Sequence, residues 1–262
     1  MAMYVNESGP ANAPTIVFLH GGGIGGWMWN PQVERLSDYH RLVPDLPEHG
    51  QSAGEAPFTM NDATARVAEL IRTRAHGERA HVVGLSLGAQ MTAHLLATAP
   101  EVVDHAIISS ALTRPFPGMS LLYPSVNWMY KMYRPFKDAA WLIRANMQSS
   151  GIPEQYFAEV REDTRLLTAG ALAHVLTENM RFRLSTVLSK VNTPTLVLAG
   201  QKEYSLMHQS ARDLVTALPN AKAFLAPKLG HIWNLQAPEL FTRTVRAWIT
   251  DQPLPQGLLP LQ

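Results

Sequence analysis

The pentad G-L-S-L-G centred on Ser86 follows an apolar run at residues 81–85 and precedes a helical pattern that begins near Leu87. Glycines on both sides of the serine let the chain turn sharply from a strand into a helix, so that the hydroxyl projects from the turn. A serine held in this way is typical of a nucleophile in acyl transfer. The alternative is an ordinary strand-to-helix turn in which the serine only caps the helix. The strand and helix patterns on its two sides favour the nucleophile.

A nucleophilic serine needs a base, because a hydroxyl is a weak nucleophile at neutral pH. His231 lies between an apolar run at residues 223–226 and a helical pattern at residues 238–250, which places it on a loop at the end of a strand. His208, which opens another helical pattern close to Glu203, is the competing candidate. Chain order and loop position lead us to predict His231 as the base.

The third requirement is a buried carboxylate that accepts the imidazole N–H, fixes its tautomer and stabilises the imidazolium. Glu203 follows the apolar run at residues 195–199 and preserves the chain order serine, acid, histidine between Ser86 and His231. The alternative is a solvated loop charge beside Lys202. We predict Glu203 as the triad acid.

The fourth requirement is a pair of backbone N–H donors for the oxyanion of the tetrahedral transition state. A glycine run at residues 21–23 follows the apolar run at residues 15–19, and its amides are unobstructed. We predict the amides of Gly22 and Leu87 as the donors, and we expect His20 to brace the loop through backbone hydrogen bonds. A glycine run can also cradle phosphate, but the pattern G-x-x-x-x-G-K-[ST] is missing.

The elements that must position these residues follow from hydrophobic periodicity. Short apolar runs alternate with helical patterns, and this order predicts a mostly parallel sheet with helices on both faces, an α/β fold. Ligands bind beyond the carboxyl ends of such strands, where each motif above lies. The predicted strands are residues 15–19, 41–46, 81–85, 106–109, 195–199 and 223–226, and the predicted helices are residues 61–75, 87–98, 206–217 and 238–250.

The alternation stops between residues 113 and 191, which are predicted to be helical only. We interpret this stretch as a helical cap inserted in a core made of residues 1–112 and 192–250. The last residues, 251–262, hold three prolines and are predicted to form a C-terminal tail.

Aromatic residues and methionines crowd the first third of the predicted cap. Trp128, Met129, Met132 and Tyr133 are our candidates for substrate binding. The alternative is that these side chains pack a small core of the cap itself. We expect the cluster between Phe116 and Phe136 to form a wall of an acyl pocket.

Composition excludes several kinds of partner. Apolar residues make up 46% of the 262 residues and charged residues 16%, which suits a globular enzyme. The 22 basic and 21 acidic residues are interspersed, so neither nucleic acid nor a membrane is an expected partner. No cysteine is present, and we expect no metal and no cofactor. Without a signal-peptide pattern at the N-terminus, a cytoplasmic location is expected. The oligomeric state is left open.

Taken together, these motifs resemble the α/β-hydrolase superfamily, in particular its cap-bearing serine esterase-like branch. The resemblance implies an α/β-hydrolase fold, a triad of Ser86, His231 and Glu203, and an oxyanion hole at Gly22 and Leu87. The acid in this family is usually aspartate; glutamate is one methylene longer, so its loop must retreat. The similar stretches are VFLHGGG at residues 17–23, PDLPEHGQS at 44–52, VGLSLG at 83–88, PTLVLAG at 194–200, GH at 230–231 and PE at 238–239.

The resemblance and the residues together predict a hydrolase of carboxylic esters with small to medium apolar acyl groups. A serine at position 86 disfavours the branches that use an aspartate nucleophile. Acyl transfer, perhydrolysis and thioester hydrolysis would use the same triad and stay open. So does a small-molecule receptor that turns over slowly.

Overall fold

The computed structural model describes residues 3–55, 57–114 and 126–261, with only the backbone described at residues 126–129. Its sheet has the strand order β1-β3-β2-β4-β5-β6-β7-β8. The inner strands β2 to β7 run parallel, and β1 and β8 pair antiparallel at the two edges. The strands are β1 Val5–Ser8, β2 Thr15–Leu19, β3 His40–Pro44, β4 Ala80–Leu85, β5 Val103–Ser109, β6 Thr195–Gly200, β7 Ala221–Ala226 and β8 Leu259–Pro260.

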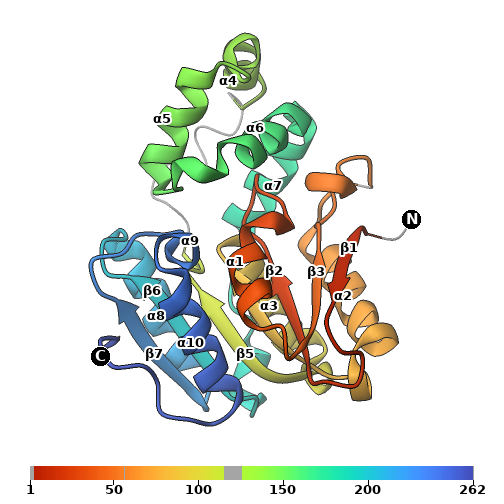
Figure 1. The fold of residues 1–262 in the computed structure, drawn as a ribbon, viewed down its shortest axis with the longest axis vertical. Coiled ribbons are helices and arrows are strands. Elements are labelled where there is room, and N and C mark those ends of the chain that lie inside the picture. The colour runs from red at the N-terminus through yellow and green to blue at the C-terminus, as the bar shows by residue number, and fades with distance from the viewer. Residues whose placement is uncertain (1–2, 56, 115–125, 262) are drawn as a thin grey trace.

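Helices cover both faces of the sheet (Figure 1). The helices of the core are α1 Asn30–Arg35, α2 Met60–Arg74, α3 Leu87–Thr98, α8 Ser205–Ala217, α9 Trp233–Gln236 and α10 Pro238–Ile249, with short 3₁₀ turns at Gly26–Trp29, Gly50–Ser52, His76–Glu78 and Pro100–Val102.

Two hydrophobic cores result, one on each side of the sheet, because successive side chains of a strand point to opposite faces. Val82 of β4 packs in the core that holds Val67 of α2 and Leu95 of α3. Its neighbour Val83 packs in the other core, with Phe18 of β2 and Phe241 of α10. Burial on both faces is the reason why the central strands are nearly continuous apolar runs.

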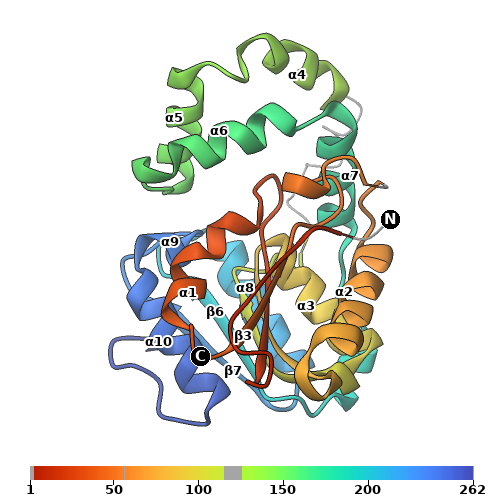
Figure 2. The same cartoon turned by 45° about the vertical axis from the view of Figure 1, so that its right-hand side comes forward.

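Between β5 and β6 the described chain is helical. Figures 1 and 2 agree that α4, α5 and α6 stand beyond one end of the sheet, and that α7 leads back toward the core. This is the carboxyl end of the parallel strands, since residues of α6 contact the loop that follows β2. The elements are α4 Val126–Tyr133, η6 Arg134–Phe136, α5 Ala140–Ser150, η7 Glu154–Tyr156, α6 Phe157–Leu166, α7 Ala169–Arg181 and η8 Thr186–Lys190.

The predicted fold class is confirmed, and each predicted strand and helix of the core is present with ends shifted by a few residues. The edge strands β1 and β8 and the short helices α1 and α9 were not predicted from the sequence. β8 lies within the predicted tail, where Leu259 pairs with Leu225 of β7. The boundaries of the cap and the tail as separate units stay predictions. None of the helices in the described ranges has the length and apolar content needed to cross a membrane.

Candidate active site

Ser86 lies on a sharp turn between β4 and α3. Its φ of 57° and ψ of −113° put it in a backbone region that side-chain-bearing residues rarely adopt. A Cβ at Gly84 would clash with the carbonyl oxygen of Gly88, and one at Gly88 would clash with the carbonyl oxygen of Leu19. The two glycines are therefore required for α3 to pack this close to β2 and β4. The buried strand and the buried helix on either side of Ser86 keep its backbone in this unfavourable conformation.

The glycine run after β2 lies beside this turn. A Cβ built on Gly21 would be 3.6 Å from Cβ of Ser86, and one built on Gly22 would be 3.6 Å from Cδ2 of Leu87. The structure thus brings together the two residues predicted to form the oxyanion hole. Leu87 is the first residue of α3, where backbone N–H groups have no partner within the helix.

His20 braces the glycine loop, as predicted. Its Nδ1 donates to the carbonyl oxygen of Gly21 at 2.8 Å, and its Nε2 accepts from the N–H of Leu46 at 2.9 Å. Burial lowers the pKa of His20 to about 4 against the opposing effect of the Gly21 hydrogen bond. The imidazole is therefore neutral at pH 7, which suits one donating and one accepting nitrogen.

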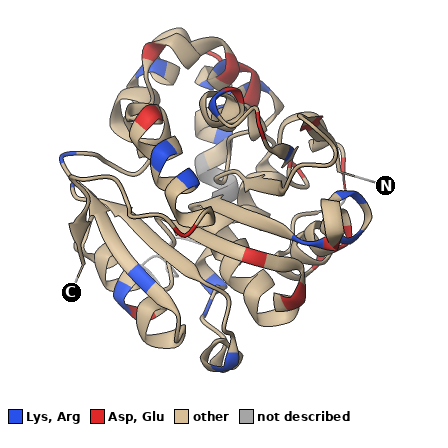
Figure 3. Cartoon of the chain, turned by 60° about the horizontal axis from the view of Figure 1, so that its bottom comes forward, with Lys and Arg blue, Asp and Glu red and all other residues tan. Residues whose placement is uncertain are grey.

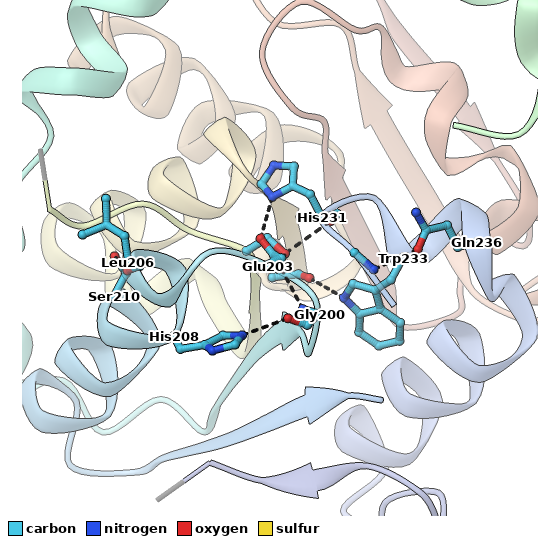
Figure 4. A network of polar contacts seen from close by, with 11 residues as sticks. Gly200, Glu203, Leu206, His208, Ser210, His231, Trp233 and Gln236 are labelled. Atoms are coloured by element: carbon cyan, nitrogen blue, oxygen red, sulfur yellow. Dashed lines mark hydrogen bonds and ion pairs between the residues drawn. The ribbon is translucent and has the colours of Figure 1, made fainter. Parts of the chain in front are cut away.

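Glu203 and His231 form the central contact of the site (Figure 4). Nδ1 of His231 lies 2.7 Å from Oε2 of Glu203. The glutamate side chain is 3% exposed, whereas the imidazole is 38% exposed. The other carboxylate oxygen accepts from Ser110 Oγ and from the N–H of Gly200, each at 2.7 Å. Burial acts to raise the pKa of Glu203, but the hydrogen bond and charge interaction with His231, together with the hydrogen bonds from Ser110 and Gly200, outweigh it and leave that pKa lowered.

Sequence reasoning missed Ser110, although a polar residue at the carboxyl end of a predicted strand was an available signal. Ser110 directly follows β5 and has a positive φ of 58°. Its N–H donates to the carbonyl oxygen of Leu198 at 2.7 Å, which ties the turn to β6. The hydroxyl thereby points at the triad carboxylate proposed from the sequence.

The competing histidine, His208, lies away from Ser86. Nε2 of His208 lies 3.0 Å from the carbonyl oxygen of Gly200, at the base of the Glu203 loop. His208 lines neither of the two cavities that contain Ser86, whereas His231 lines both. The geometry accordingly favours His231 as the base and His208 as a support of the loop.

Two cavities meet at Ser86 and His231. The large cavity has a volume of about 760 Å³ and the small one about 170 Å³. Within the described residues no hydrogen bond joins Ser86 Oγ to His231, and such bonds are often long before a substrate binds. The large cavity is lined by Ser86, Ser110, Leu112, Gln148, Ser149, Ser150, Gly151, Lys202, Glu203, Tyr204, Met207, Lys228, Gly230, His231 and Gln236. The small cavity is lined by Gly21, Gly22, Gly23, Ile24, Met28, Leu85, Ser86, Ser150, Ile152, Val160, Asp163, His231 and Ile232.

Described residues of the inserted helices line these cavities, but Met132 and Tyr133, two of the four candidates for substrate binding, are not among them. Met132 of α4 is 58% exposed, and Tyr133 packs against Tyr130 with ring centroids 6.3 Å apart. Neither Met132 nor Tyr133 lines either cavity. The side chains of Trp128 and Met129 lie outside the described residues, as does Phe116. A high content of aromatic residues and methionines does not by itself show which of them line a cavity and which pack within the inserted helices or lie on their surface.

Asp163 of α6 is the second residue that sequence reasoning missed. Its carboxylate lines the small cavity and accepts from the N–H of Gly25 at 2.8 Å and from Trp27 Nε1 at 2.6 Å. Burial raises the pKa of Asp163 to about 6, against the lowering effect of the two hydrogen bonds. Nothing in the sequence indicates that a charged residue in the middle of a helical pattern, such as Asp163, has its side chain in a cavity.

No cluster of three or more His, Cys, Asp or Glu side chains with the geometry to hold a metal ion occurs in the part of the chain that the structure describes.

Comparison with known proteins provides independent evidence for the fold and the family of the chain. The model of the alpha/beta hydrolase family matches residues 16–244. An AB hydrolase superfamily protein of Gibberella zeae is 31% identical over 252 residues, which cover 93% of this chain and 82% of that protein. A pimeloyl-[acyl-carrier protein] methyl ester esterase of Pectobacterium atrosepticum is 27% identical over 265 residues, covering 94% of this chain and 98% of the esterase. The crystal structure of a thermophilic esterase from Thermogutta terrifontis superposes with a TM-score of 0.78 at 21% identity and covers 95% of this chain and 93% of the esterase.

Proposed function

The chain belongs to the alpha/beta hydrolase family and is a hydrolase, and on this premise we propose that it cleaves carboxylic esters through an acyl-enzyme on Ser86. One observation carries the proposal. A serine on a strained strand-to-helix turn and a histidine bonded to a buried carboxylate open onto the same two cavities.

In the acylation step His231 takes the proton of the Ser86 hydroxyl while Oγ attacks the ester carbonyl carbon. The negative charge that develops on the carbonyl oxygen is stabilised by the amides of Gly22 and Leu87. Glu203 holds the imidazole in the tautomer that leaves Nε2 free to accept this proton, and its charge stabilises the imidazolium.

Collapse of the tetrahedral intermediate breaks the bond to the alcohol oxygen, and His231 donates its proton to that oxygen. Water then enters, loses a proton to His231 and attacks the carbonyl carbon of the acyl-enzyme. The acid is released when Oγ of Ser86 leaves and regains its proton. One ester and one water thus yield one acid and one alcohol.

We assign the acyl group to the small cavity. Its lining is mostly apolar, with Ile24, Met28, Ile152 and Val160 among its residues. A cavity of roughly 150 Å³ in another protein holds one benzene molecule, so about 170 Å³ accepts an acyl group on the order of six heavy atoms. The large cavity lies within the range of roughly 300–1,000 Å³ of small-molecule sites and takes the alcohol part.

A series of p-nitrophenyl esters from acetate to decanoate tests the proposal. We expect many turnovers per enzyme molecule, the highest kcat/KM for short chains, and complete dependence on Ser86. A single burst of nitrophenol equal to the enzyme concentration would favour the slow receptor. Absence of any release across the series would refute ester hydrolysis.

A further inference from the structure

Resting on the proposed ester hydrolysis, we infer that the substrate carries an oxyanion, a carboxylate or a phosphate, on its alcohol part, and that Lys202 and Lys228 bind this group in the large cavity. The inference comes from the unequal distribution of charge between the two cavities that meet at Ser86.

The lining of the large cavity contains two lysines and one carboxylate, Glu203. That carboxylate is already bonded to His231, Ser110 and Gly200 and is nearly inaccessible. Within the described residues neither lysine forms an ion pair. The undescribed stretch at residues 115–125 contains no aspartate or glutamate that would supply a partner. Two positive charges therefore face the alcohol side of the site without a carboxylate of the protein to neutralise them.

The two lysines are held at one rim by bonds between their loops. The N–H of Lys202 donates to the carbonyl oxygen of Leu229 at 2.9 Å, and the N–H of Lys228 donates to Oε1 of Gln201 at 3.0 Å. These bonds cross between the loop after β6 and the loop after β7. The loops that carry Glu203 and His231 are thus the same loops that carry the lysines.

The backbone of Lys228 is also unusual. Its φ is 63°, in the left-handed region where glycine or asparagine is the ordinary residue. A residue with a side chain lowers the stability of the fold at such a position, and residues with this kind of backbone strain are often found at functional sites. Here it adds a second positive charge, three residues before His231, to the lining of the large cavity.

The small cavity has the opposite charge. Asp163 is the one Asp, Glu, Lys or Arg side chain in its lining, and the pKa of about 6 leaves most of the carboxylate ionised at pH 7.5. An anionic acyl group would be repelled there, because two like charges in a partly desolvated cavity disfavour each other. The charges therefore orient the substrate, with a short uncharged acyl group beside Asp163 and the oxyanion beside the lysines.

Acetyl esters of para-substituted phenols provide the test. We would measure kcat/KM for 4-acetoxybenzoate, for 4-acetoxyphenyl phosphate, and for the neutral 4-acetoxybenzamide at low ionic strength. Intrinsic reactivity differs between these leaving groups, so the quantity compared is the ratio of anionic to neutral kcat/KM between enzyme variants. Each partly exposed charge pair contributes modestly, and we expect the ratio to fall roughly tenfold in the double variant Lys202→Gln, Lys228→Gln. A larger fall for the phosphate than for the carboxylate would identify phosphate as the bound group, and the converse would identify carboxylate.

Lys222→Gln is the matched control, since Lys222 is an exposed lysine of β7 that lines neither cavity. It should leave the ratio unchanged. Salt at 0.5 M should lower the ratio of the parent enzyme and have less effect on the double variant, because it screens exposed charges.

A ratio that is equal in the parent enzyme and the double variant would overturn the inference. So would faster cleavage of 4-nitrophenyl hydrogen succinate, whose charge is on the acyl part, than of 4-nitrophenyl butanoate. If the neutral benzamide ester is hydrolysed with dependence on Ser86, these results contradict only the oxyanion site. If no ester is hydrolysed, the proposed function fails and this inference fails with it.

Discussion

Nδ1 of His231 lies 2.7 Å from Oε2 of Glu203, and the carboxylate is buried beneath a partly exposed imidazole. This arrangement leaves Nε2 as the nitrogen available to Ser86. The second oxygen of the longer glutamate side chain is fixed by the N–H of Gly200, the last residue of β6 and three residues earlier in the chain. The Glu203 side chain thus turns back toward the end of the strand that precedes its loop.

The first prediction is that Glu203→Gln lowers kcat by up to roughly 10⁴, because a neutral amide can donate to Nδ1 and favour the wrong imidazole tautomer. Glu203→Asp should lose less, since it keeps the charge and shortens the reach. Steady-state kinetics on p-nitrophenyl butanoate measure both variants. Glu239→Gln, an exposed glutamate in the first turn of α10, is the control. Near-normal kcat with an unshifted pH profile for Glu203→Gln would refute its role.

The second prediction concerns Ser110, whose hydroxyl donates to Oε1 of Glu203. Ser110→Ala removes one of three hydrogen bonds to that carboxylate and should lower kcat roughly tenfold, the equivalent of about 1.4 kcal/mol. KM should change little, because Ser110 positions the acid and not the substrate. Ser189→Ala, an exposed serine of η8, is the control. A loss confined to KM would mean that Ser110 acts on the substrate instead.

The parallel core of the fold could be predicted from the sequence because burial on both faces gives long apolar runs, as in β4 and β6. The edge strands β1 and β8 could not. Three of the four residues of Val5–Ser8 are polar, and Leu259–Pro260 has only two residues, so neither has the pattern of a buried strand. They pair because a neighbouring strand offers free backbone groups, which is a property of the assembled sheet.

The residues of the candidate site likewise include some that could be predicted from the sequence and some that could not. Ser86, Glu203 and His231 could be selected because each follows a predicted strand in a fixed chain order. Asp163 could not, because its position depends on how the inserted helix α6 packs against the glycine loop, over a separation of 138 residues from Gly25. Substrate contacts from such an insert follow from tertiary packing and carry no local motif.

The third prediction concerns acyl length. Ile152→Ala enlarges the small cavity and should move the optimum of the p-nitrophenyl series to longer acids, with each additional buried methylene worth about 0.8 kcal/mol, roughly fourfold in kcat/KM. Met132→Ala is the matched comparison, because Met132 lies exposed on α4. If Met132→Ala shifts the optimal acyl length and Ile152→Ala does not, the acyl pocket is formed by α4, as predicted from the sequence, and not by the small cavity.

The fourth prediction is a pH dependence of stability that comes from Asp163. Burial raises its pKa from 3.8 to about 6, so the folded state binds a proton more tightly than the unfolded state does. The stability that protonation contributes is fully present below the unfolded pKa and is lost as the pH rises through about 6. Between pH 5 and pH 7.5 the parent protein should therefore lose about 1 kcal/mol relative to Asp163→Asn. Chemical denaturation of both proteins at the two pH values measures this difference.

An unchanged or opposite difference would mean that the carboxylate is not destabilised by burial in the folded protein. Asp138→Asn, which removes an exposed aspartate of the same inserted segment, is the control and should show a smaller dependence.

The most direct test of the account is the hydrolysis of p-nitrophenyl butanoate by Ser86→Ala. Removal of the nucleophile should lower kcat on the order of 10⁶, while circular dichroism and the thermal unfolding midpoint stay close to those of the parent protein. Rapid acid quenching of the parent enzyme should trap a butanoyl group on the peptide that contains Ser86, and the variant should show none. A folded Ser86→Ala protein that retains more than a few per cent of the parent kcat would contradict covalent catalysis at Ser86.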